Sequence, residues 1–153
     1  SKYLENATVH SIDISEEATK LALNNSKINN CNGNLTFENI DVNSFEIINE
    51  LKYDIIVSNP PYISLSEYNT LEDELLKHEP KNALNDTKDG YNFYELISTK
   101  ANSWLNDKGK IYFEVGYSQS QKVKEVLKAN NFISIDSVKD YQNIERVVSG
   151  ILG

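Results

Sequence analysis

Short apolar runs alternate along this chain with longer stretches in which apolar residues recur every three or four positions. The short runs are typical of β-strands, and strands are expected over residues 7–13, 35–40, 53–58, 110–115, 132–138 and 146–152. The longer stretches predict helices, expected over residues 16–30, 45–51, 92–105 and 119–129. The run Asp54-Ile55-Ile56-Val57-Ser58 is almost wholly apolar, which suits a parallel strand buried on both faces.

The alternation of strands and helices predicts an α/β sheet with helices on both of its faces. Because only a short loop separates the last two strands, they are expected to form a hairpin, which makes one strand antiparallel. In such sheets a ligand binds beyond the carboxyl ends of the strands, and Asp13, Asp41 and Asn59 all lie at such ends. A long polar segment over residues 63–90 follows, and segments of this length are usually functional or disordered.

The composition is that of one ordinary globular domain: of 153 residues, 39% are hydrophobic and 25% are charged. The net charge of −8 and the single arginine, Arg146, argue against tight binding to nucleic-acid phosphates. The single cysteine, Cys31, excludes an internal disulfide, and no cluster of Cys and His has the spacing of a metal site. The lack of a disulfide fits a reducing compartment, so we expect a cytoplasmic protein. No stretch is apolar enough to span a membrane, so no membrane partner is expected.

The segment Asn59-Pro60-Pro61-Tyr62 carries the most specific chemistry in the sequence. The lone pair of an amide or exocyclic amine is delocalised, so this nitrogen is a poor nucleophile and positioning must supply most of the catalysis. The Asn59 side-chain oxygen and the Pro60 carbonyl can each accept one N–H of a substrate NH2 group, on which the Tyr62 ring can stack. The prolines direct these acceptors by restricting the backbone. The alternative is that the prolines merely end a strand and that Tyr62 is a surface aromatic residue.

Four stretches of the chain resemble the catalytic domain of the HemK/PrmC family, the protein-(glutamine-N5) methyltransferases that modify peptide-chain release factors. They are residues 11–15 (SIDIS), 56–63 (IVSNPPYI), 78–84 (HEPKNAL) and 140–148, which ends in NIERVV. The Asn-Pro-Pro-Tyr segment is shared with N6-adenine DNA and N2-guanine RNA methyltransferases. The Glu-Pro block and the Arg-Val-Val tail are what make the resemblance specific to the HemK/PrmC family. The resemblance implies a Rossmann-like class I methyltransferase fold, S-adenosylmethionine (SAM) as methyl donor, and a release-factor glutamine as acceptor.

On the pattern of this family, Asp13 accepts the ribose hydroxyls of SAM with Ile14 beside it, and Asp41 with Val42 contacts the adenine. A carboxylate suits two neighbouring hydroxyl donors. From the residues alone, Asp13 could instead cap the following helix, a task that Ser15 could also perform. Asp41 could equally be a turn residue at the end of a strand.

The same pattern assigns substrate binding to Asn59, Pro60, Pro61, Tyr62, Glu79 and Pro80. Asn59, Pro60 and Tyr62 are the catalytic residues among them, and Asn59 also contacts the cofactor. Glu79 and Pro80 would shape the substrate pocket, although Glu79 could equally be a solvated charge in a loop.

The glycine-rich loop of the family, whose backbone N–H groups meet the methionine part of SAM, should precede Asp13. Only residues 1–6 precede the first expected strand, and the first glycine is Gly33. We therefore expect residues 1–153 to be a partial catalytic domain, without the first strand, this loop and the N-terminal substrate-recognition domain. Unpaired strand edges would favour self-association. The chain alone is expected to bind SAM weakly or not at all, which titration calorimetry can measure.

Two other functions stay open from the sequence. A nucleic-acid amino methyltransferase, such as an N6-adenine enzyme, could use the same acceptors on a flipped base, although the acidic charge argues against it. The chain could also be a binding module or an inactive fragment of either enzyme. Arg146 is expected to bridge a carboxylate or backbone carbonyls near the sheet end rather than to act in catalysis, and His10 is expected to be a packing residue.

Overall fold

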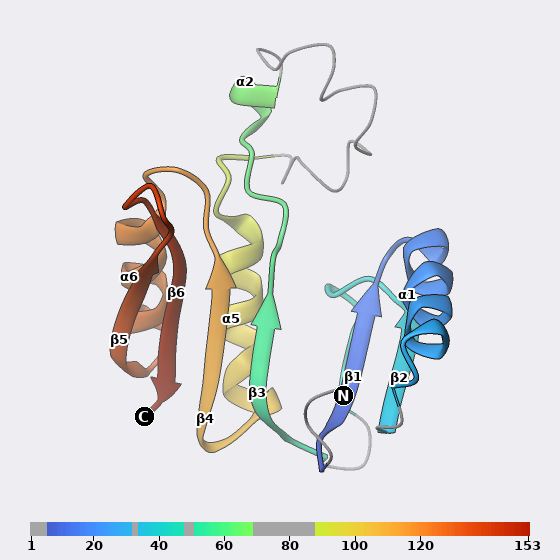
Figure 1. Ribbon diagram of the computed structural model, residues 1–153. Helices are drawn as coiled ribbons and strands as arrows, with labels where there is room; N and C mark the ends of the chain where they lie inside the picture. Colours follow the sequence, from blue (N-terminus) through green and yellow to red (C-terminus); the bar gives the residue numbers. More distant parts are fainter. Residues whose placement is uncertain (1–5, 32–33, 48–50, 69–87) are drawn as a thin grey trace. The chain divides into compact units, whose positions relative to one another are not determined.

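The computed structural model describes residues 6–31, 34–47, 51–68 and 88–153 (Figure 1). Contacts divide the chain into two compact units, residues 1–46 and residues 47–153, and each unit has its own sheet. No helix in the described ranges is long and apolar enough to cross a membrane.

The first unit is a strand-helix-strand arrangement. It consists of β1 (Thr8–Asp13), α1 (Glu16–Ile28) and β2 (Asn34–Asn39). The two strands pair in parallel, with Thr8 opposite Asn34 and Asp13 opposite Asn39. Parallel neighbours end at the same edge of a sheet, so the segments that follow β1 and β2 both leave from that edge.

Helix α1 begins where the sequence supplies a cap and a favourable charge. The Ser15 hydroxyl accepts a hydrogen bond from the Ala18 N–H at 3.2 Å, and Glu16 in the first turn suits the positive end of the helix dipole. No residue of the helix is buried, and the side chains of Leu21 and Ile28 are 60% and 76% exposed. The apolar face that the sequence predicted for this helix is therefore uncovered in the described part of the chain.

The second unit contains a four-stranded mixed sheet in the order β3-β4-β6-β5. Its strands are β3 (Tyr53–Ser58), β4 (Leu105–Glu114), β5 (Phe132–Lys139) and β6 (Glu145–Leu152). Strand β3 runs parallel to β4, whereas β6 is antiparallel to both of its neighbours, β4 and β5. This arrangement confirms the predicted closing hairpin and the single antiparallel strand.

Two helices cover one face of this sheet, α5 (Asn92–Trp104) behind β3 and β4 and α6 (Ser120–Ala129) behind β5 and β6 (Figure 1). Ile111, Phe113 and Val148 are fully buried on this face, where the Tyr94 ring meets Phe113 edge to face at 5.2 Å. On the opposite face Ile55 and Val57 are 55% and 76% exposed. Within the described part of this unit the helices therefore lie on one face of the sheet, where α5 and α6 pack side by side.

The helix predicted over residues 45–51 is not formed in its described part, since residues 45–47 and 51–52 are irregular. The reason lies just before it. The Asp41 carboxylate accepts the backbone N–H of Asn43 at 2.8 Å, and the Asp41 carbonyl accepts the N–H of Ser44 and of Phe45. A side chain that bonds its own backbone two residues on favours a turn over a helix.

The other differences concern where elements begin. Strand β4 starts at Leu105, directly after α5, rather than near residue 110, and its pairing with β3 shifts register between Tyr53 and Ile55. Lys108, with a φ of 60°, lies within this irregular stretch. The polar segment predicted over residues 63–90 contains a short helix, α2 (Leu65–Tyr68), and its residues 69–87 lie outside the described residues.

Candidate active site

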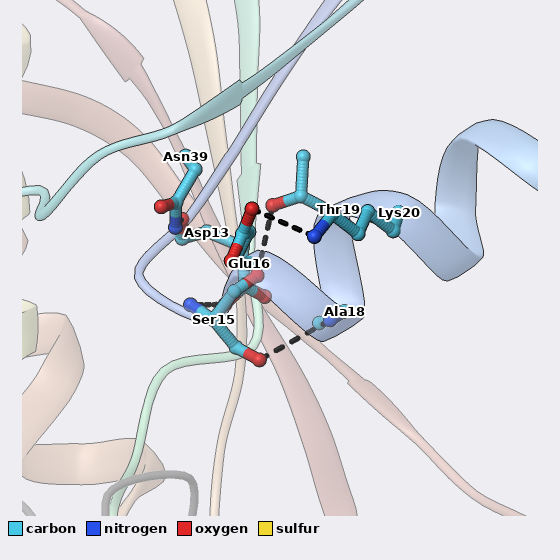
Figure 2. A network of polar contacts seen from close by, with 7 residues as sticks. All are labelled: Asp13, Ser15, Glu16, Ala18, Thr19, Lys20 and Asn39. Carbon is cyan, nitrogen blue, oxygen red and sulfur yellow. Dashed lines mark hydrogen bonds and ion pairs between the residues drawn. The ribbon is translucent and has the colours of Figure 1, made fainter.

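Asp13 ends strand β1 with its side chain exposed (Figure 2). Its Oδ1 accepts the N–H of Ser15 at 2.7 Å, and its backbone carbonyl accepts the N–H of Ile40 at 3.0 Å and the side-chain amide of Asn39 at 2.9 Å. The hydroxyl of Ser15 caps α1, so the alternative role of Asp13 as helix cap is not what the structure shows. Among the described residues nothing bonds to Oδ2 of Asp13, and this oxygen can accept ligand hydroxyls.

Asp41 follows strand β2 and is half-buried. Its Oδ1 accepts both the backbone N–H and the side-chain amide of Asn43, each at 2.8 Å. The turn role considered for Asp41 from the sequence is therefore confirmed, while its contact with adenine stays a prediction. Because β1 and β2 are parallel, Asp13 and Asp41 follow strand ends at the same edge. Ile14 is 59% exposed there, and Val42 is half-buried.

The segment Asn59-Pro60-Pro61-Tyr62 follows strand β3 of the other unit. Pro60 is buried, Pro61 and Tyr62 are half-buried, and Asn59 is exposed. Within the part of the chain that the structure describes, the Asn59 side chain makes no hydrogen bond. A buried proline therefore anchors an exposed amide whose oxygen accepts no hydrogen bond from any residue that the structure describes.

A residue that the sequence did not single out, Gln119, holds the end of this segment. Its Nε2 donates to the backbone carbonyl of Tyr62 at 2.9 Å. Gln119 lies at the N-terminal end of α6 and is only 7% exposed. A glutamine at a helix start, where Ser, Thr, Asp or Asn is usual, is the one unusual signal that could have drawn attention to it.

Glu79 and Pro80, predicted to shape the substrate pocket, lie outside the described residues, so their role stays a prediction. In the described ranges no group of His, Cys, Asp and Glu is arranged to hold a metal ion.

A family model described as a methyltransferase domain matches residues 1–150. The chain belongs to the methyltransferase domain family. The release factor glutamine methyltransferase of Fusobacterium nucleatum is 47% identical over 95% of this chain and 40% of that protein. The enzyme of the same name from Clostridium acetobutylicum is 33% identical over 100% of the chain and 54% of that protein. The resemblance predicted from the four motifs is thus confirmed, and the chain spans about half the length of these relatives.

Solved structures confirm the Rossmann-like methyltransferase fold. A methyltransferase from Pyrococcus furiosus has a TM-score of 0.63 at 20% identity and covers 95% of this chain and 63% of that one. The release factor-specific protein-(glutamine-N5) methyltransferase from Alicyclobacillus acidocaldarius has a TM-score of 0.51 at 17% identity. The match covers 98% of this chain and 83% of that one.

Two residues of this methyltransferase domain have structural roles, as the sequence predicted. The Arg146 Nε donates to Asp140 Oδ2 at 3.1 Å. The N–H of Ile144, and then the Arg146 guanidinium, hold the pKa of Asp140 below its usual range. His10 packs edge to face on Phe45 at 5.4 Å and shares a hydrogen bond of 3.0 Å with Glu38.

Proposed function

We propose that the protein transfers a methyl group from SAM to the side-chain amide nitrogen of a glutamine in peptide-chain release factors. The observation that carries this proposal is the exposed amide of Asn59, bonded to nothing in the described part of the chain and followed by the buried Pro60. The names of the relatives support the choice of glutamine as the methyl acceptor.

In this proposal the first unit holds the cofactor. Oδ2 of Asp13, to which no described residue bonds, and the second oxygen of Asp41 are acceptors that suit ribose hydroxyls and the exocyclic amine of adenine. Ile14 and Val42 supply apolar contact beside them. When bound, SAM supplies a methyl group made electrophilic by the positive charge on its sulfur.

The second unit orients the acceptor. The Asn59 oxygen and the Pro60 carbonyl each accept one N–H of the substrate carboxamide, which turns the nitrogen lone pair out of the hydrogen-bonding plane. Tyr62 stacks on the flat amide, with Pro61 beside it, and Glu79 and Pro80, which lie outside the described residues, are proposed to bind the same substrate. Orientation of this kind replaces a strong base, because the amide nitrogen needs alignment more than deprotonation before transfer.

We further propose that residues 1–153 form part of the catalytic domain of a longer enzyme. The share of its relatives that the chain covers, 40% and 54% for the two named above, supports this proposal. A further domain would then recognise the release factor. The free Cys31 suits a reducing compartment, and we propose the cytoplasm as the site of action.

The test uses the full-length protein with labelled SAM and, in separate reactions, a release factor, DNA and RNA. We expect label on a glutamine of the release factor and a loss of about a hundredfold in the Asn59→Ala variant. Asn24→Ala, at an exposed asparagine on α1, is the matched control and should keep its activity. Label on nucleic acid alone would overturn the proposal in favour of a nucleic-acid amino methyltransferase.

A further inference from the structure

Gln119 connects three segments that are far apart in the sequence. Its Nε2 donates to the carbonyl of Tyr62 at 2.9 Å and lies 3.4 Å from the carbonyl of Gly90. Its Oε1 accepts the N–H of Gly116 at 3.0 Å. One buried side chain thereby joins the loop after β3, the loop before α5 and the turn after β4.

A glutamine fits the hydrogen-bonding groups of this junction, which consists of Gln119 and its partners at Tyr62, Gly90 and Gly116. Two carbonyls require a donor on one side of the group, and a backbone N–H requires an acceptor on the other. A carboxylate at position 119 would keep the acceptor but lose the donor, and an aliphatic side chain would lose both. The hydroxyl of Tyr94 is a further neighbour, because it donates to the Glu114 carbonyl at 2.9 Å and lies 3.4 Å from Oε1 of Gln119.

Gly116 and Gly90 allow the backbone to lie close to the side chain of Gln119 and to Tyr62. A Cβ at Gly116 would lie 2.8 Å from Oε1 of Gln119 and 2.9 Å from Cδ2 of Tyr62. A Cβ at Gly90, where φ is +90°, would lie 2.6 Å from the Tyr62 carbonyl oxygen and 2.9 Å from Nε2 of Gln119. The ring and the carbonyl of Tyr62 are therefore both held at this junction.

We propose that Gln119 is a positioning residue that sets the orientation of Asn59-Pro60-Pro61-Tyr62. It fixes Tyr62 directly, and the two prolines transmit the restraint to Asn59 because their own φ angles are fixed. Gln119 acts through Tyr62 and does not touch the methyl acceptor. This inference rests on the proposed function of the segment, and it adds the residue that keeps the segment in place.

The main test variant is Gln119→Glu in the full-length protein, which is almost the same size and keeps the Gly116 acceptor. Gln121→Glu is the matched control, since Gln121 is an exposed glutamine on the same helix that bonds only to Glu125 in the described part of the chain. Gly116→Ala is a second variant, in which an added methyl group disturbs the same junction without removing the amide.

The first measurement is hydrogen exchange at the amides of residues 62–64, which does not depend on any activity. We expect exchange there to be about tenfold faster in Gln119→Glu and in Gly116→Ala, and unchanged in Gln121→Glu. The second measurement is kinetic. We expect kcat for the release factor to fall about ten- to hundredfold in both junction variants, with KM for SAM changed less than about twofold.

Unchanged exchange at residues 62–64 in Gln119→Glu would overturn the inference, and so would a kcat equal to that of the Gln121→Glu control. A rise in KM for SAM that matches the fall in kcat would also overturn the inference. General loosening of the fold would explain such a result without any specific role for Gln119. If the wild-type protein methylates no glutamine, the proposed function fails, while the exchange measurement still decides whether Gln119 holds Tyr62.

Discussion

The replacement of Tyr94 by phenylalanine tests the packing beneath the candidate site. Tyr94 is fully buried on α5, and its hydroxyl donates to the backbone carbonyl of Glu114 at 2.9 Å. The ring itself packs edge to face on Phe113. Phenylalanine keeps the ring and removes only the hydroxyl, so the change removes one part-buried hydrogen bond to Glu114 and the 3.4 Å contact with Oε1 of Gln119.

The expected magnitude follows from that single bond. Leaving a buried carbonyl without its donor costs about 1–3 kcal/mol, the bond to Glu114 is part-buried, and no large cavity adds to the cost because the ring remains. We therefore expect the free energy of unfolding to fall by about 2 kcal/mol. For a protein of about 150–250 residues, this corresponds to a decrease of about 4–8 °C in Tm.

The pH dependence of the free energy of unfolding provides a second test of the role of Tyr94. Burial raises the pKa of the Tyr94 hydroxyl above its ordinary value, so folding favours the protonated form. A group whose pKa is raised by folding contributes its stability fully below the unfolded pKa, here about 10, and loses it as the pH rises further. The stability advantage of the wild type over Tyr94→Phe should therefore shrink above pH 10.

Urea unfolding followed by circular dichroism, repeated from pH 7 to pH 11, measures both effects. Tyr141→Phe is the control, because the Tyr141 side chain is fully exposed. Unfolding of Tyr94→Phe at the same urea concentration as this control at pH 7 would refute the predicted loss of stability. A wild-type advantage that grows above pH 10 would refute the account of the raised pKa.

Two further predictions concern other charged groups. The hydroxyls of Ser120 and Ser137, together with the Lys124 ammonium, lower the pKa of Glu145 to about 2, so its contribution to stability is present above pH 4.5 and is lost as the pH falls toward 2. Glu145→Gln should therefore lower Tm at pH 7, and the difference from wild type in scanning calorimetry should close near pH 2; a constant difference would contradict this. Asp13→Ala in the full-length protein should raise KM for SAM about tenfold or more, whereas Asp107→Ala, at an exposed aspartate, should not; equal KM values would remove Asp13 from the cofactor site.

Most of the elements were predictable because their signals are local. A helix start depends on a cap such as Ser15 and on charges within one turn, and the hairpin of β5 and β6 depends on two apolar runs and a short loop. The helix predicted near residue 45 is absent from the described residues for a local reason too, since the Asp41 side chain accepts a hydrogen bond from the N–H of Asn43.

The candidate site was predictable only in part, for a related reason. The sequence alone determined that Asp13 and Asn59 lie at the carboxyl ends of strands and that two prolines stiffen the backbone after Asn59. It left open whether Asp13 or Ser15 caps α1, because both can accept the same kind of hydrogen bond; the geometry assigns the cap to Ser15 and leaves one oxygen of Asp13 unbonded in the described residues.

The contacts of Gln119 could not be predicted from the sequence, because its partner Tyr62 lies 57 positions away and Gly90 lies 29 away. A side-chain amide has no preferred partner in the unfolded chain. The parallel pairing of β3 with β4 places the ends of both strands together, and only then do the Tyr62 carbonyl and the Gly116 N–H come within reach of one glutamine. Local backbone preferences therefore determined the elements, whereas the sheet topology decided which polar groups meet.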